Sequence, residues 1–447
     1  SSIIKSMDKK LRYIDVLGLV IGAIIGWGSF TLPGTKFLRE AGVINTFIGL
    51  LIGGIFIMVI QNGYHIMLEN HREDGGEFTY ALNHLGTGHG FVVGWSLSLC
   101  YLSMVPLNAG AFVLLLREIF GAKMDFFYLY SISGYPIYLT DVLVMSAVII
   151  LFGYINIQGL KISTKVQNVM SILLAVIVSG ILGLMFMRSD LQAFHQNYVD
   201  NYRFSFSEIS KIIAIAPFLF VGFDVVPQVS EELGFKPEKS TILVGISVLI
   251  GIFIYGALNT IAGLGFSPEA AMKTHWAVAD AVIQHLGKTG FYIMLIALAA
   301  AVIGGINGFM IASSKLVASL SQRKHLGERY SITNEKGVQP YAILFVCAIS
   351  LIGAFVGRRV IIYIVDMASV LAAVAYMYVS FISISLAKSK IDKVKCALGA
   401  LISAGFIVLL MFPGSPAQLS KEAFISLILW TLCGVLVYQF RKRKNVS

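Results

Sequence analysis

Long apolar stretches, separated by short polar breaks, recur along this chain and restrict what it can fold into. Each has about 20 residues, which is enough to cross ~30 Å of hydrocarbon as a helix. With 57% hydrophobic and 13% charged residues, the chain has too few polar groups to cover a soluble protein of 447 residues. The sequence therefore predicts an all-α membrane protein with about 12 transmembrane helices. We expect them at residues 13–34, 44–68, 91–116, 138–155, 166–187, 208–230, 241–265, 291–315, 340–357, 360–387, 395–412 and 422–440.

The basic residues indicate how the chain is oriented in the membrane. The sequence has 34 Lys and Arg residues against 24 Asp and Glu residues. If the N-terminus is cytoplasmic, most of the basic residues fall on the cytoplasmic side, as the positive-inside rule requires. The basic tail from Arg441 to Lys444 is then a topology anchor at an anionic leaflet and not a nucleic-acid-binding patch. We expect a multi-pass protein of the cell inner or plasma membrane, with both termini in the cytoplasm and no nucleic-acid partner.

The helices group into two halves of a single transmembrane domain, because no Ser-, Pro- or charge-rich linker divides residues 1–447. The segments A-L-N-H-L-G (81–86) and V-I-Q-H-L-G (282–287) fall in corresponding breaks of two five-helix blocks, residues 13–187 and 208–387. A match this short also arises by chance. An odd number of crossings separates the starts of the blocks, so they face opposite ways, as in the inverted repeats of secondary transporters. Two further helices follow in residues 395–440.

The first apolar stretch is interrupted near its centre, where residues 22–30 read G-A-I-I-G-W-G-S-F. A glycine costs about 1 kcal/mol in a helix interior, and two that flank one residue favour unwinding. Unwound backbone in hydrocarbon needs protein groups or a polar ligand to satisfy it. The half-helix that begins at Gly28 would direct free N–H groups at a carboxylate, and the carbonyl of Ile24 would accept from an ammonium. The alternative is that these glycines only let helices pack closely.

The sixth apolar stretch has a second interruption, where residues 218–224 read F-L-F-V-G-F-D between two prolines. Gly222 lies almost as deep in its helix as Gly26 does in the first. Two broken helices in corresponding positions of two repeats indicate a binding site near the middle of the membrane. Asp224 lies in the same apolar stretch, where an unpaired charge costs several kcal/mol. We expect it to face the bundle interior, either as a proton carrier or as a structural hydrogen-bond acceptor.

Taken together, these motifs resemble those of the amino acid–polyamine–organocation (APC) transporters. The resemblance covers nearly the whole chain, with its motifs in the right order. It implies a LeuT-like fold of five plus five helices, with helices 1 and 6 discontinuous and an amino acid bound between them. The residues that carry it are G-A-I-I-G-W-G-S-F, G-G-E-F-T-Y (75–80), N-I-Q-G-L-K-I-S-T-K-V-Q-N (156–168), F-L-F-V-G-F-D with Glu231, Glu232 and Pro237, and Asn307 with Ser313, Ser314 and Lys315.

The resemblance also implies roles for individual residues. The turn at residues 26–28 matches the one that binds a substrate carboxylate. The carbonyls of Ile24 and Val221 match the groups that hold the amino end, and Phe218 matches an aromatic gate. Asp224 falls where some members have an acidic residue proposed to respond to protons. The expected substrate-binding residues are Ile24, Gly26, Trp27, Gly28, Ser29, Phe218, Val221 and Gly222.

Two positions depart from the family pattern. Position 27 is usually small, but here it is Trp, so a hydroxyl is lost and a large ring either narrows the pocket or offers a π-face to a cation. Ser29 is a candidate replacement donor. Several relatives carry a lysine on helix 5 where sodium binds in sodium-driven cousins, and the corresponding position here is near Leu174. Because Ser313 and Ser314 also lie too near the end of helix 8 for a sodium site, we favour proton symport or exchange.

The sequence therefore predicts a secondary active transporter of a small-molecule substrate, a zwitterionic amino acid. We expect no cofactor and no metal, because there is no G-x-x-x-x-G-K-[ST] loop and the four cysteines stand singly. An enzyme is disfavoured because no nucleophile–base set falls on one face. Two alternatives stay open. One is an amine or polyamine carrier of the same fold, which the lost hydroxyl at position 27 favours, and the other is a transport-fold receptor that binds without flux.

Overall fold

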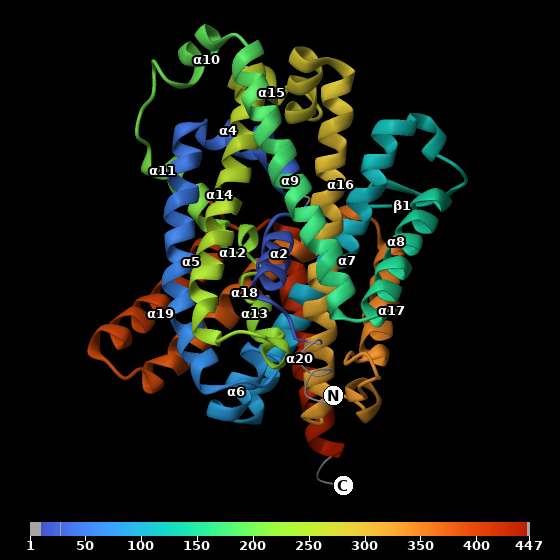
Figure 1. Ribbon diagram of the computed structural model, residues 1–447, viewed down its shortest axis with the longest axis vertical. Coiled ribbons are helices and arrows are strands. Elements are labelled where there is room, and N and C mark those ends of the chain that lie inside the picture. The colour runs from blue at the N-terminus through green and yellow to red at the C-terminus, as the bar shows by residue number, and fades with distance from the viewer. Residues whose placement is uncertain (1–9, 27, 445–447) are drawn as a thin grey trace.

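The computed structural model describes residues 10–26 and 28–444, and most of them are helical (Figure 1). The long helices are α5 (Ile44–Asn70), α7 (Thr87–Phe120), α8 (Leu139–Ile157), α9 (Leu160–Arg188), α14 (Ser240–Gly265), α16 (Ala277–Gln322), α17 (Pro340–Val356), α18 (Arg358–Leu386), α19 (Lys390–Met411) and α20 (Lys421–Lys444). The shorter ones are α2 (Tyr13–Ile24), α3 (Gly28–Thr31), α4 (Phe37–Ala41), α6 (Glu77–Leu85), α10 (Leu191–Tyr198), α11 (Phe206–Ala214), α12 (Ala216–Leu219), α13 (Val225–Gln228) and α15 (Pro268–Met272).

Nine of the helices in the described residues are long and apolar enough to cross a membrane. A tenth span is formed by α2 together with residues 28–41, with a bend of 48° between the two parts. The stretch expected at 340–357 forms the shorter apolar helix α17, and the stretch at 208–230 is divided among α11, α12 and α13. Each expected stretch thus contains helix, and the prediction of an all-α, multi-pass membrane protein is confirmed. The count of twelve crossings stays a prediction.

The two similar segments, 81–86 and 282–287, have the same local shape. The first is the end of α6 and its terminating glycine, Gly86, at φ 92°. The second lies inside α16, which Gly287 divides at φ 74°. Positive φ is readily available only to glycine, so each segment ends a short helix at a glycine and starts a long helix directly after it. We expected helix 8 to begin at residue 291, but α16 begins at Ala277. Hydropathy placed the start too late, because the first turns of α16 contain polar residues.

A small β-hairpin lies between α7 and α8. Its strands β1 (Tyr128–Ile132) and β2 (Tyr135–Tyr138) pair antiparallel. The two residues between them, Ser133 and Gly134, have φ of 52° and 76°, and positive φ at both central positions is typical of tight hairpin turns. The hydropathy pattern did not predict this hairpin, because its strands are shorter than the window that detects membrane helices.

Large apolar side chains are exposed on the outer helices. Val176 on α9, Leu401 on α19 and Leu436 on α20 are 65%, 69% and 65% exposed. Contiguous apolar surface of this kind is costly in water, so these faces fit a lipid environment. The interrupted helices lie inside this layer, because α2 packs against α9, α14 and α16, while α13 contacts α2 and α16 (Figure 1).

Candidate functional site

The interruptions in the two broken helices lie in direct contact. The helix α2 ends at Ile24, and the chain between α12 and α13 turns at Gly222, where φ is 117°. A methyl group added to Gly222 would lie 2.7 Å from Cβ of Ala23 and 2.9 Å from its carbonyl carbon. Backbones approach this closely only where a residue has no side chain. Residues about 200 positions apart in the sequence therefore meet at one buried point.

The expected substrate-binding residues of the first helix surround its break. A methyl group on Gly28 would lie 3.2 Å from Cε1 of Phe218, so the residue expected to start the second half-helix packs against the expected aromatic gate. The backbone N–H and the hydroxyl of Ser29 both donate to the carbonyl of Gly26, at 3.1 and 2.7 Å. The Ser29 hydroxyl therefore stabilises the turn in this structure. Trp27 lies outside the described residues.

Tyr255 on α14 connects the ends of both broken helices. Its buried hydroxyl lies 3.0 Å from the carbonyl oxygen of Ile24 and 3.1 Å from that of Leu219. A hydroxyl has one proton, so it donates to one of these carbonyls at a time. The carbonyl expected to hold a substrate ammonium therefore already has a neighbouring donor within the protein. The sequence analysis missed Tyr255, whose only signal was a phenol inside the apolar run 241–265.

Replacing Tyr255 with Phe is expected to lower the free energy of unfolding by about 1 kcal/mol, the usual net contribution of one buried hydrogen bond. The ring keeps its packing, but the carbonyls of Ile24 and Leu219 lose their donor. Thermal unfolding of the detergent-solubilised protein measures the change. Tyr292→Phe is the control. Tyr292 on α16 is exposed, so loss of its hydroxyl should leave the free energy of unfolding unchanged. Equal stability of the Tyr255→Phe variant and the wild type would contradict this role.

Asn108 brings a polar side chain from α7 to the break in the first helix. Its Oδ1 atom lies 3.1 Å from the position of a methyl group on Gly26 and 2.6 Å from one on Gly305 of α16. The side chain is buried, and its Nδ2 atom donates to the carbonyl of Met104 at 2.8 Å. Sequence reasoning did not single out Asn108. An amide inside an apolar stretch was the available signal, since buried amides are kept where partners satisfy them.

Three motif residues form a polar network beside this break. Asn307 on α16 donates through Nδ2 to Oε1 of Gln167 on α9, at 3.2 Å, and accepts at Oδ1 from Nδ2 of Asn156 on α8, at 3.0 Å. Gln167 in turn donates to the carbonyl of Gly304 at 3.1 Å. All three side chains are buried, and each has a partner on another helix. The network therefore fixes α8, α9 and α16 relative to one another behind α2.

Asp224 follows the break in the second helix and faces the interior, with 1% of its surface exposed. Its Oδ1 atom accepts from the backbone N–H of Gly222 at 3.1 Å, and its Oδ2 atom accepts from the hydroxyl of Tyr101 on α7. These contacts fit the expected structural acceptor, and the burial of a carboxyl at this depth also fits the expected proton carrier.

An ion cluster around the buried side chain of Lys315 lies at the end of the molecule where α6 is found (Figure 1). Nζ of Lys315, on α16, lies 2.5 Å from Oε1 of Glu232 and 3.5 Å from Oδ2 of Asp74. The backbone N–H of Glu231 donates to Oδ1 of Asp74 at 2.9 Å, and that of Leu11 donates to the carbonyl of Glu232 at 2.7 Å. The cluster thus joins α16, the loop before α6, the segment after α13 and the start of the first helix.

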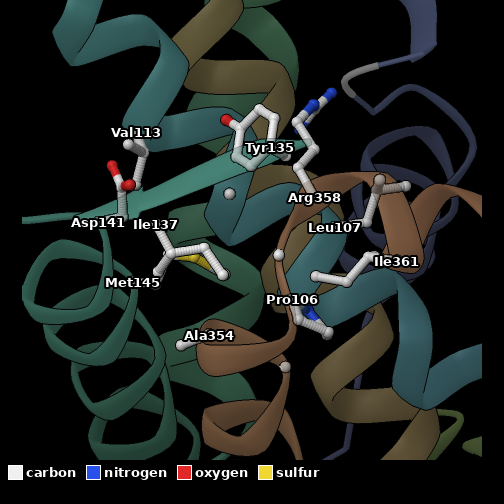
Figure 2. Close-up of a pocket in the computed structure, with 13 residues that line it drawn as sticks. Pro106, Leu107, Val113, Tyr135, Ile137, Asp141, Met145, Ala354, Arg358 and Ile361 are labelled. Atoms are coloured by element: carbon white, nitrogen blue, oxygen red, sulfur yellow. The ribbon is translucent and has the colours of Figure 1, made fainter. Parts of the chain in front are cut away.

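Figure 2 shows a separate cavity between α7, the β-hairpin, α17 and α18. Its volume is about 30 Å³, which is room for roughly one water molecule. Most side chains around it are apolar, with Tyr135, Asp141 and Arg358 as polar members. Of these, Asp141 is paired with Arg117 on α7 at 2.6 Å, so its charge is already compensated within the protein.

Comparison with known proteins identifies the family. Residues 11–433 match the family model described as amino acid permease. A methylthioribose transporter of Bacillus subtilis is 24% identical over 463 aligned residues, which cover 99% of this chain and 95% of the relative. The large neutral amino acids transporter small subunit 2 of Mus musculus is 24% identical, and the alignment covers 78% of this chain and 65% of that relative.

A third relative, the Asc-type amino acid transporter 1 of Mus musculus, is 23% identical, with 76% of this chain and 64% of the relative covered. The alignments to the two mouse proteins thus span just under two thirds of those proteins, whereas the bacterial relative is matched over almost its whole length. The family match extends over nearly every expected helix, and the relatives are transporters. The resemblance inferred from the sequence motifs is confirmed: the chain belongs to the amino acid permease family of the APC superfamily.

Proposed function

We propose that this transporter is a secondary active carrier of amino acids in the cytoplasmic membrane, working by alternating access as a proton-coupled symporter or an exchanger. The substrate would bind between the interrupted helices α2–α3 and α12–α13. Its carboxylate would face the turn at residues 26–28, and its amino end would face the carbonyls of Ile24 and Val221. Both termini would lie in the cytoplasm.

The observation that carries this proposal is the meeting of two helix interruptions inside an apolar bundle. The contacts of Gly222 with Ala23 and of Gly28 with Phe218 bring both sets of expected ligand residues to one place. Helix ends leave backbone N–H and C=O groups without intrahelical partners. In a membrane interior such groups are tolerated where they line a site for a polar solute, and a zwitterion presents both charges that they complement.

The shared shape of the segments 81–86 and 282–287 supports alternating access. In each, a short helix ends at a left-handed glycine directly before a long helix. Two five-helix blocks, residues 13–187 and 208–387, would then be related as an inverted repeat, with residues 395–440 appended. Such a repeat gives two arrangements of similar energy, which open the site to one side or the other.

Uptake into proteoliposomes tests the function directly. The panel contains neutral amino acids and the matching decarboxylated amines, with and without an imposed pH gradient and with sodium absent. With one proton carried per zwitterion and no membrane potential, one pH unit drives accumulation of about tenfold, since ~1.4 kcal/mol corresponds to one factor of ten. Displacement of a labelled amino acid by the amine, but not by alanine, would favour the amine carrier. Binding without flux would favour the receptor.

A second substrate class follows from the full-length match to the methylthioribose transporter of Bacillus subtilis. That alignment covers 95% of the relative, whereas the alignments to the two mouse proteins cover 65% and 64% of those proteins. Methylthioribose therefore belongs in the uptake panel. Uptake of methylthioribose that no amino acid inhibits would replace the amino-acid proposal with a carrier for this thioether sugar.

The proton part of the proposal rests on Asp224, and Asp224→Asn tests it. Asparagine keeps the size of the side chain and one acceptor oxygen, for example for the N–H of Gly222, but it does not titrate at physiological pH. We expect the accumulation of about tenfold per pH unit to disappear in this variant. Full gradient-driven accumulation by Asp224→Asn would show that Asp224 carries no coupling proton.

A further inference from the structure

Glu77 is a buried carboxyl at the start of α6, with no exposed surface. Its Oε1 atom accepts from the hydroxyl of Tyr64 on α5 at 2.7 Å, and its Oε2 atom accepts from Nε2 of Gln228 at the end of α13 at 3.1 Å. Both donors are neutral, so neither compensates a negative charge. An isolated carboxylate in such surroundings pays a large desolvation penalty.

Glu77 lies near Asp224. Tyr64, which donates to Glu77, packs its ring against Phe223, the residue before Asp224, at a centroid distance of 5.1 Å, and the two carboxyls interact electrostatically. Two ionised carboxylates have only acceptors, so a hydrogen bond between them requires a proton on one of the two. Asp224 is held in place by Tyr101 and Gly222, and Glu77 by Tyr64 and Gln228. These contacts keep the two acidic groups near one another.

None of the salt bridges between described residues reaches either carboxyl. The charged side chain that α16 contributes to this region, Lys315, pairs with Asp74 and Glu232 instead. The other titratable groups facing the pair are Tyr64 on α5, Tyr80 on α6, Cys100 and Tyr101 on α7, Tyr376 on α18, and Asp74 in the loop before α6. All of these are neutral or acidic, so the pair has no cation to balance a double negative charge.

Two further polar atoms beside the pair have no partner among the described residues. They are Oε1 of Gln228 and the hydroxyl oxygen of Tyr376 on α18, and both residues are fully buried. The ring of Tyr376 packs against Phe223, next to Asp224, at a centroid distance of 5.2 Å. Unpaired buried polar atoms are uncommon in folded proteins, so these two make the surroundings of the pair a candidate for a functional role.

The pKa of Glu77 is raised well above its ordinary value, first by burial and then by the neighbouring Asp224 carboxyl. Two neighbouring carboxyls disfavour a second negative charge, so a proton is held more tightly there than on an isolated carboxyl.

We propose that Glu77 and Asp224 together form the proton-binding site of this transporter, holding a single proton between their carboxyl oxygens. Binding converts one carboxylate and a proton into a carboxylic acid, and release reverses this, so no other reactant is needed. The inference rests on the proposed proton-coupled function and adds Glu77 as the second proton-binding residue. Asp224 contacts the helix break through the backbone N–H of Gly222, whereas Glu77 lies at the start of α6, which is at the lower end of the molecule in Figure 1.

A short polar route leads from the pair toward that end. Nε2 of Gln228 lies 3.1 Å from Glu77 and 3.3 Å from the carbonyl of Gly75. The preceding residue, Asp74, belongs to the ion cluster with Lys315 and Glu232. Gln228 and Gly75 thus connect Glu77 to the loop that carries this cluster.

Glu77→Gln tests the pair in the uptake assay, because Gln keeps the size of the side chain and an oxygen that can accept from Tyr64, but it cannot titrate. We expect the accumulation of about tenfold per pH unit to be lost, and the exchange that remains to become independent of pH. The double variant with Asp224→Asn should lose no more than either single variant, because both changes remove the same proton. Glu77→Asp, which retains a carboxyl, should recover part of the accumulation. Glu73→Gln is the control, because Glu73 lies exposed in the same loop.

The outcomes separate the pair from the transport function. If the wild type accumulates substrate and Glu77→Gln does so equally, the pair is overturned while the transporter stands. If the wild type accumulates substrate without any response to the pH gradient, coupling through the pair is overturned as well.

If no amino acid is transported, the proposed function fails, and infrared spectroscopy of the purified protein still decides the inference. There, the wild type at neutral pH should show a protonated-carboxyl C=O band that both Glu77→Gln and Asp224→Asn weaken. A spectrum unchanged by both variants would overturn the shared proton, even if either variant fails in transport.

Discussion

Replacing Gly28 with Leu is expected to abolish substrate binding while leaving the protein folded and inserted. A first added carbon already lies 3.2 Å from Cε1 of Phe218, and a leucine adds three more in the space between the two helix breaks. Overpacking of this kind costs about 1–3 kcal/mol, and a bound state that bears this cost loses roughly 5- to 150-fold in affinity even if the ligand still fits. Binding of labelled amino acid to the purified variant is the measurement.

Gly180→Leu is the matched control for this experiment. Gly180 lies on an exposed part of α9, and an added methyl group there meets no atom within 4 Å. Leucine also favours helix more than glycine does, by about 1 kcal/mol. This variant should therefore bind as the wild type does. Unchanged affinity in a folded Gly28→Leu protein would place the substrate elsewhere and remove the main support for the site between the two breaks.

Replacing Lys315 with Met is expected to destabilise the protein by about 3–5 kcal/mol, as is usual when one partner of a buried ion pair is removed. Lys315 is 3% exposed and neutralises both Glu232 and Asp74. Methionine fills a similar volume, so the loss reflects charge and not packing. Thermal unfolding in detergent measures it, and Lys165→Met, at an exposed position of α9, is the control.

The loss caused by Lys315→Met should depend on pH. Burial raises the pKa of Asp74, Lys315 opposes this rise, and Glu232 adds to it. Without the lysine, the pKa of Asp74 rises further in the folded state than in the unfolded state. The folded state then binds the extra proton, so stability is retained at acidic pH and lost as the pH rises through the raised pKa. A stability difference between variant and wild type that is the same at acidic and neutral pH would contradict this account.

Glu232→Gln added to Lys315→Met should restore part of the stability, since it removes one uncompensated charge.

The sequence alone determined the class of the protein and the place where its helices break. Apolar runs of membrane length predicted the helices, because hydrocarbon leaves the backbone no alternative to local hydrogen bonds. The glycines at 26, 28 and 222 marked the interruptions, since their backbone freedom is a property of the residue itself. Asp224 was identified for the same reason: a charged residue within an apolar run is conspicuous without any knowledge of its neighbours.

Only the tertiary structure decided which residues from other helices meet these breaks. Tyr255, Asn108 and Glu77 are 231, 82 and 147 residues from their partners Ile24, Gly26 and Asp224 along the chain. Glu77 lies in the motif at residues 75–80, but the motif gave it no role, and hydropathy gives no reason to prefer Tyr255 or Asn108 over other tyrosines or amides. Their roles arise from contacts between helices that lie far apart in sequence. Such contacts depend on how the helices pack, which a pattern of local hydrophobicity does not encode.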